Sequence, residues 1–165
     1  MLAGGCNVPA RPARKGGAKR YYSEIYIGEY LGAVHHACET KSSEVDIWWW
    51  LIGHLPQPTA YAAFQQYDDQ LIVAGGQSAE GDLRDAYIIQ LGNRHGMTIT
   101  PLPSLPEPRS GMASALIENV LYLIGGRVNG KLSNTVLSLD LSRPQKEWRA
   151  ETPYPHSPFL QLVAM

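Results

Sequence analysis

The chain has 165 residues, 44% hydrophobic and 18% charged, so it can bury a core of ordinary size. Its formal net charge is −1, and its Lys and Arg residues are spread along the chain without the basic stripe that a nucleic-acid binder needs. It has no apolar run long enough for a membrane span, and residues 1–17 do not have the pattern of a secretory signal, so we expect neither nucleic acid nor membrane as a partner.

Short apolar runs rich in Ile, Val, Leu and Tyr follow one another along the chain, and each closes on a turn signal. Helical periodicity is scarce, and the 16 Gly and 12 Pro lie at turns between the runs. This pattern predicts an all-β protein. The expected strands are 24–27, 45–52, 60–67, 71–74, 85–91, 97–100, 112–117, 120–124, 134–141 and 147–150.

Three apolar stretches run into a pair of glycines: LAGG at 2–5, LIVAGG at 71–76 and LYLIGG at 121–126. When the last two pairs are aligned, the tight links before them also align, YDDQ (67–70) with IENV (117–120). The proline-flanked segments further upstream and the strands that follow align as well. Four short strands in roughly fifty residues are the sequence form of a kelch-type propeller blade.

The repeat divides residues 1–165 into blade units at about 1–54, 55–104 and 105–151, with the start of a further blade at 152–165. We therefore predict an all-β, kelch-type β-propeller of about three blades, each a four-stranded antiparallel sheet. Because the first unit begins inside its second strand and residues 159–165 stop within a strand, we expect a partial propeller, a fragment of a longer protein. Its open blade edges predict self-association, for example as a homodimer.

The glycine pairs are expected to shape the blade, because a residue without a Cβ permits unusual φ and ψ angles and close approach of a neighbouring chain. The residues just after each pair, and those in the proline-flanked segment before each blade, should meet on one rim around the central funnel. Loops on a rigid scaffold often carry binding groups. The rim residues predicted in this way are Asn7, Thr59, Gln77, Arg109, Arg127 and His156.

Other features point to packing rather than chemistry. Trp48–Trp50 and Trp148 fall on outermost strands, so we expect them to pack between blades. Cys6 and Cys38 could form one bridge or remain two free thiols; they are far apart and fit no zinc spacing, and we expect buried or idle thiols.

The opening GGCNVPARPARKGGAKRYYSEIYI (4–27) resembles the blade of bacterial cyclically permuted mutarotases, kelch proteins akin to N-acetylneuraminate epimerase. In that family a glycine pair, Asn and Pro precede a GGxK turn, a Tyr pair and an acidic residue. These features correspond here to Asn7, Pro9, Gly16-Gly17, Lys19, Tyr21-Tyr22 and Glu24. The segment LPQPTAYAAF (55–64) is similar to the family's lead into its next blade.

The resemblance implies an isomerase that interconverts the anomers of sialic acid, a small-molecule sugar acid, in the bacterial periplasm. A base removes the proton of the anomeric hydroxyl while an acid protonates the ring oxygen, and the ring recloses on the other face. The reaction needs no cofactor, and we expect none, nor a metal.

Arginine suits the substrate carboxylate because its guanidinium offers a fork of donors, so Arg109 and Arg127 are the predicted anion clamp. Lys19 and Asn7 gain support from the motif, and Gln77 and His156 complete the predicted substrate-binding set. Glu24 and Glu80 are the predicted acid and base, with Asp82 a further candidate.

Two other functions fit a kelch period. The first is a non-catalytic module that binds a protein or a glycan through its rim. The second, a copper radical oxidase, needs a Tyr, Cys and His metal cluster on the funnel, and we set it aside because only Cys6 falls near the rim without matching histidines.

Overall fold

The computed structural model describes residues 2–7, 19–33, 45–92, 96–143 and 147–158, and within them every regular element is a β-strand. The first sheet is antiparallel, with strand order β1-β2-β3. Its strands are β1 (Leu2–Asn7), β2 (Arg20–Ala33) and β3 (Val45–His54). β2 is longer than the predicted strand 24–27, because it begins at Arg20 and continues to Ala33.

The second sheet is a four-stranded antiparallel meander, in which each strand pairs with the next one along the chain. A tight turn joins its first two strands, and Asp68 in that turn has a left-handed φ of 51°, a conformation that Asp tolerates better than most residues. The strands are β4 (Ala63–Tyr67), β5 (Gln70–Ala74), β6 (Ala86–Leu91) and β7 (Met97–Pro101).

The third sheet repeats this plan with the same order of strands along the chain. Glu118 takes the place of Asp68 in the tight turn, with φ 53°. The strands are β9 (Ala113–Ile117), β10 (Val120–Ile124), β13 (Val136–Asp140) and β14 (Arg149–Glu151). The predicted all-β architecture of repeated antiparallel sheets is therefore confirmed.

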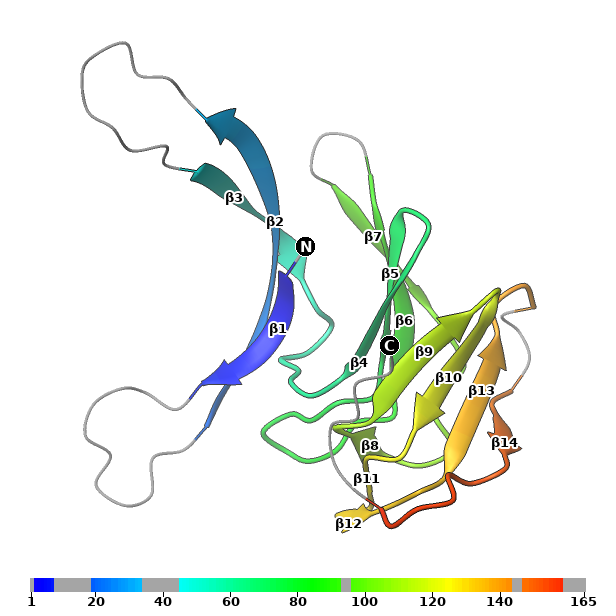
Figure 1. Cartoon of the computed structure of the whole chain (residues 1–165). Helices are drawn as coiled ribbons and strands as arrows, with labels where there is room; N and C mark the ends of the chain where they lie inside the picture. The colour runs from blue at the N-terminus through cyan, green and yellow to red at the C-terminus, as the bar shows by residue number, and fades with distance from the viewer. Residues whose placement is uncertain (1, 8–18, 34–44, 93–95, 144–146, 159–165) are drawn as a thin grey trace.

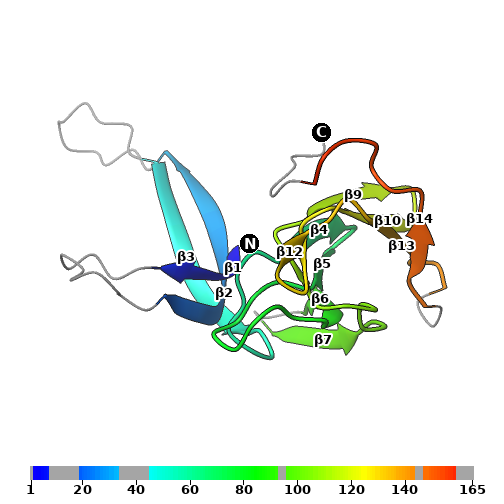
Figure 2. The ribbon, with the colours of Figure 1, turned by 90° about the horizontal axis from the view of Figure 1, so that it is seen from below.

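The three sheets lie in a row, with the second sheet between the first and the third (Figures 1 and 2). Apolar side chains alternate along the strands, so each face of the second sheet can bury them against a neighbour. Ile25 of the first sheet packs with Val73, Tyr87 and Ile89 of the second. A separate core joins the second sheet to the third, and includes Ile72, Ala74, Leu121, Leu123, Leu137 and Leu139.

The glycine pairs lie where one blade approaches the next. Gly4 and Gly75 have φ values of 62° and 60°, and a Cβ on either would collide with a backbone carbonyl oxygen. That oxygen belongs to Thr59 for Gly4 and to Arg109 for Gly75, in each case at the start of the following blade. The expected close approach is thus seen between neighbouring blades. We call the edge of the molecule formed by the glycine pairs and the loops after them the rim.

The structure also contains a fourth, small sheet at the rim, which the sequence did not predict. β8 (Arg109–Ser110), β11 (Arg127–Val128) and β12 (Lys131–Leu132) pair in the order β12-β11-β8. It joins the segment that leads into the third blade to the loop that follows that blade's glycine pair.

The tryptophans do not share one environment. Trp148 packs between the second and third sheets as expected, and its indole N–H donates to the Pro103 carbonyl oxygen at 2.8 Å. Trp48 and Trp49 are 58% and 50% exposed, so the expectation of packing between blades is wrong for them in this structure. Cys6 lies in β1 opposite Tyr21, and Cys38 lies outside the described residues.

No helix in the described part of the chain is long and apolar enough to cross a membrane.

Candidate functional site

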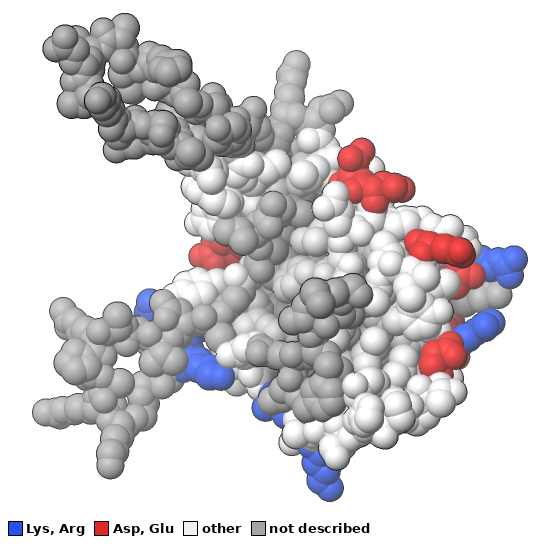
Figure 3. Space-filling model, viewed as in Figure 1, with Lys and Arg blue, Asp and Glu red and all other residues white. Residues whose placement is uncertain are grey.

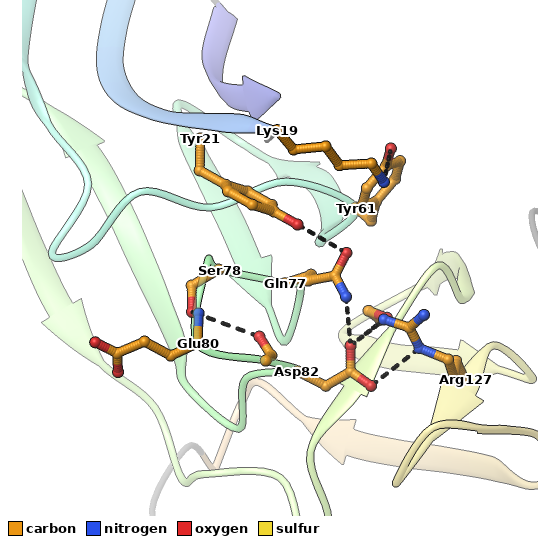
Figure 4. A network of polar contacts seen from close by, with 10 residues as sticks. Lys19, Tyr21, Tyr61, Gln77, Ser78, Glu80, Asp82 and Arg127 are labelled. Carbon is orange, nitrogen blue, oxygen red and sulfur yellow. Dashed lines mark hydrogen bonds and ion pairs between the residues drawn. The ribbon is translucent and has the colours of Figure 1, made fainter. Parts of the chain in front are cut away.

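Polar side chains from all three sheets meet at the rim (Figure 4). The Tyr21 hydroxyl on β2 donates to Gln77 Oε1 at 3.1 Å. Gln77 follows the glycine pair of the second sheet, and its amide lies 3.5 Å from Asp82 Oδ1. Asp82 is in turn bonded to Arg127, which follows the glycine pair of the third sheet. Gln77 and Arg127, predicted on the rim from the repeat, therefore lie in one hydrogen-bonded chain.

Asp82 is the centre of this network. Its side chain is 8% exposed, and its two oxygens accept bonds from Arg127 Nε at 3.1 Å and Nη2 at 2.7 Å. The Ser110 hydroxyl donates to Oδ1 at 2.8 Å. Burial alone raises the pKa of Asp82, but the bonds from Arg127 and Ser110, the Arg127 charge and a backbone bond from Gly130 hold that pKa below its usual value. Asp82 is therefore ionised at neutral pH.

Arg127 keeps donor capacity beyond this ion pair. Its bond to Asp82 raises the pKa of the guanidinium, against a smaller opposing effect of burial. The bonds to Asp82 use Nε and Nη2, so Nη1 is the nitrogen that can donate to a ligand. The Arg127 side chain is 33% exposed, which places it within reach of solvent.

Lys19 and Tyr61 form a second pair beside the network (Figure 4). Lys19 Nζ lies 3.4 Å from the Tyr61 hydroxyl and 5.1 Å from the centre of its ring. The ammonium thus lies against the negative face of an aromatic ring. Lys19 directly precedes β2 of the first sheet and Tyr61 lies in the segment that leads into the second, so this pair also spans two sheets.

Arg109 does not face the rim as predicted. It is 1% exposed, and its Nη1 donates to the carbonyl oxygens of Gly125 and Thr135 at 2.8 and 3.1 Å. Its Nη2 donates to the Thr135 hydroxyl at 2.7 Å. A guanidinium used in this way ties the leading segment of the blade to the ends of two strands. The prediction that Arg109 clamps a substrate anion is corrected, because its guanidinium is buried: Nη1 and Nη2 bond to Gly125 and Thr135, and Nε is enclosed by the protein without a partner among the described residues.

The predicted acid and base stand apart from the network. Glu24 lies on β2 and lines a hollow of about 300 Å³ with Tyr22 and Tyr26, and its carboxylate accepts the Ser23 N–H at 3.0 Å. The Glu80 side chain points away from the other labelled residues (Figure 4) and is exposed. Asp82 is the carboxylate that the fold brings to the polar cluster.

The remaining predicted rim residues have separate surroundings. Thr59 is 2% exposed, and its hydroxyl donates to the Gln57 carbonyl at 2.9 Å. His156 is exposed, with its ring centre 5.3 Å from that of Tyr154. Asn7 ends β1 opposite Arg20, and its side chain is outside the described part of the structure.

Sequence reasoning missed the site roles of Tyr21, Tyr61 and Ser110. Tyr21 and Tyr61 lie in the two segments that resemble the mutarotase family, so the resemblance drew attention to both residues but predicted no contact for either. Ser110 follows Arg109 directly, and the alternation of side chains along β8 places the serine toward Asp82.

The charged side chains of the described residues lie mainly toward the edges of the view in Figure 3, with an uncharged surface between them. No group of three or more His, Cys, Asp or Glu among the described residues is arranged to hold a metal ion. What the cluster offers chemically is two cations, one ionised carboxylate, an amide and two phenols, a set suited to binding a polar, anionic ligand.

Comparisons with known proteins agree with this fold. Residues 108–153 match the kelch motif, which covers the third sheet. Alpha-scruin of Limulus polyphemus is 27% identical over 125 residues, which are 71% of this chain and 13% of alpha-scruin. The solved structure of YjhT is similar with a TM-score of 0.58 at 15% identity, covering 70% of this chain and 38% of that one.

The chain thus spans a minor part of the length of both proteins. Together with the observed sheets, the matches show that the fold is that of a kelch-type β-propeller, with about three blades described here. The kelch part of the resemblance seen in the sequence is supported, and the narrower resemblance to mutarotases remains a prediction.

Proposed function

We propose that the rim binds a sugar acid and that this kelch-repeat chain belongs to a mutarotase that interconverts the anomers of N-acetylneuraminate. The observation that carries the proposal is the convergence of Lys19, Gln77 and Arg127 from three separate stretches of sequence. The sequence alone predicts each of them as a substrate-binding residue. The periplasm, as the compartment of such an enzyme, is part of the same proposal.

The cluster supplies what recognition of a sugar acid requires. The cations of Lys19 and Arg127 attract the carboxylate, and Arg127 Nη1 can donate to it directly. Tyr61 is 38% exposed and offers an aromatic surface beside Lys19. The Gln77 amide and the Tyr21 hydroxyl match the hydroxyl groups of a sugar, since each is both a donor and an acceptor.

Asp82 is the group of this cluster best placed to act as a base. It would accept the proton of the anomeric hydroxyl, while the Tyr21 hydroxyl would donate its proton to the ring oxygen as the ring C–O bond breaks. The open-chain ketone then recloses from its other face, and both protons return. The reaction is an isomerisation, so atoms balance without a cofactor. Glu24 and Glu80 have no part in this scheme.

The test follows the conversion of α- to β-N-acetylneuraminate by proton NMR, with ligand binding measured separately by titration calorimetry. Arg127→Ala and Lys19→Ala should weaken binding, whereas Arg143→Ala should not, because Arg143 is exposed in a turn at the opposite end of its sheet. Asp82→Asn should slow conversion more than it weakens binding. Conversion by the wild-type chain no faster than in buffer would rule out catalysis by this chain.

A non-catalytic binding module is the second candidate, and the surroundings of Asp82 favour it. Four donor contacts from Arg127, Ser110 and Gln77 converge on this carboxylate, and its lowered pKa makes it a weak base. The same experiment separates the two functions, since a module that only binds would show saturable binding with no change in the rate of anomer conversion.

A further inference from the structure

The repeat places three residues at one position of the blade, and they differ in exposure. These residues are Tyr26, Tyr87 and Leu137. Across the strand ladder, each lies opposite the residue that stands two positions before the first glycine of the glycine pair in its own sheet. Tyr87 and Leu137 are 6% and 5% exposed because the preceding sheet covers them. Tyr26 is 39% exposed.

Two tryptophans show the same contrast. Trp49 lies two residues before Leu51, the partner of Tyr26, and Trp148 lies two residues before Ala150, the partner of Leu137. Trp148 packs against the core between the second and third sheets. Trp49 is 50% exposed, and its ring lies over Gly28 of its own sheet. The same blade position is therefore partly buried in the third sheet and open in the first.

These residues belong to one continuous surface, which we call the open face of the first sheet. Pairing across β2 and β3 puts Tyr26 with Leu51 and Gly28 with Trp49, and Ile47 follows two residues earlier on β3. The side chains of Ile47, Trp49 and Leu51 are 47 to 50% exposed. Figure 2 shows that, among the described sheets, the first stands at one end of the row and has its neighbouring sheet on the opposite face. An aromatic and aliphatic face of this kind marks an interaction site.

The third sheet, at the other end of the row, has the complementary face. In the second sheet, Ile72 and Ala74 are 1% and 0% exposed because they pack on the third sheet. The repeat puts Tyr122 and Ile124 at those positions in the third sheet, and both are partly exposed. We call the surface around these two residues the forward face of the third sheet.

We propose that a second copy of this chain docks head to tail, with its forward face on the open face of the first sheet. The choice of a second copy as the occupant follows from the two contacts between sheets that the chain already contains. In each contact, the face of one sheet that corresponds to the forward face packs on the face of the next sheet that corresponds to the open face. Such a contact joins two different surfaces, so it produces a closed ring or a growing chain. It lies away from the Asp82 network and is independent of the function proposed above.

Light scattering after size exclusion tests the proposal at several concentrations of the whole chain. The wild type should exceed the mass of one chain, 18.2 kDa, by an amount that rises with concentration. Tyr26→Glu and, as an independent variant, Leu51→Gln should return the mass to that of one chain. Leu132→Glu is the matched control, because Leu132 is 48% exposed on β12, outside both faces, and it should leave association unchanged. A wild type of 18.2 kDa at every concentration overturns the proposal.

A mixing experiment tests the head-to-tail geometry. Tyr26→Glu blocks the open face and Tyr122→Glu blocks the forward face, so each variant alone should be a monomer. Mixed, they retain one intact surface each and should form a dimer that cannot grow. A Tyr122→Glu variant that dimerises by itself would show that two open faces meet each other, and would overturn the head-to-tail arrangement. Far-UV circular dichroism confirms beforehand that each variant keeps the wild-type fold.

Discussion

The Asp82 carboxylate and the Arg127 guanidinium form two hydrogen bonds between neighbouring sheets, at 2.7 and 3.1 Å. Asp82 lies in the loop after β5, and Arg127 begins β11 directly after the glycine pair of the third sheet. The pair therefore fastens the rim of one blade to the rim of the next, in addition to forming the centre of the candidate site.

Asp82→Asn should lower the free energy of unfolding by about 1–3 kcal/mol, because it removes charge-assisted bonds and leaves Arg127 without its partner. Urea unfolding followed by tryptophan fluorescence measures the change. Asp69→Asn is the control, since Asp69 is exposed in the β4–β5 turn and should change stability little. Equal effects of the two substitutions would contradict a stabilising role for the pair.

The pair also predicts a dependence of stability on pH. The folded pKa of Asp82 lies below its ordinary value, whereas in the unfolded chain it is about 4. Its contribution is therefore complete above about pH 4 and is lost as the pH falls through the folded pKa. The stability difference between wild type and Asp82→Asn should shrink in acid. A difference that stays constant from pH 7 to the acid limit would argue against this linkage.

Gly75→Ala should destabilise the fold by more than Gly130→Ala. Both glycines have left-handed φ values, 60° and 78°, so both substitutions carry the conformational cost of about 1 kcal/mol. A Cβ at Gly130 meets nothing within 4 Å, but at Gly75 it collides with the Arg109 carbonyl oxygen. Thermal unfolding measures the loss of stability in each variant, and the extra loss in Gly75→Ala reports the steric clash between the two blades. Equal losses in the two variants would mean that the blades move apart at Gly75 without loss of stability.

Arg109→Met should cost about 3 kcal/mol of stability, because it removes the buried hydrogen bonds of the guanidinium to the Gly125 carbonyl oxygen and to the carbonyl and hydroxyl oxygens of Thr135. Arg143→Met, an exposed substitution of the same kind, should be close to neutral. In a variant that remains folded, sugar-acid binding should be unchanged. A selective loss of binding with little loss of stability would restore Arg109 to the binding site.

Lys19→Ala should weaken binding of N-acetylneuraminate, and the loss should diminish as salt is added, because the contribution of an exposed ammonium is screened. Lys19→Arg should retain most of the affinity, since the charge remains. Calorimetric titration at low and high ionic strength gives both comparisons. A Lys19→Ala variant that binds as the wild type does would remove this residue from the site.

The rim positions after the glycine pairs were predictable because the repeat keeps its register. Gln77 and Arg127 follow equivalent glycines, so they had to lie at the same edge of neighbouring sheets. Arg109 was misjudged for a related reason. Its backbone does lie in β8 at the rim, but a repeat states only where a backbone runs. The direction of the guanidinium depended on the acceptor oxygens of Gly125 and Thr135 at the neighbouring strand ends.

By itself the sequence determined the kind of protein, because alternation, turn residues and glycine spacing are local properties that recur every blade. It specified antiparallel sheets, the tight turns at Asp68 and Glu118, and the edge at which polar residues gather. Only the tertiary structure decided which of those residues meet. Asp82 rather than Glu24 or Glu80 joined the cluster, and Trp148 packs against a neighbouring sheet whereas Trp49 is half exposed, because these outcomes depend on contacts between sheets that no single blade contains.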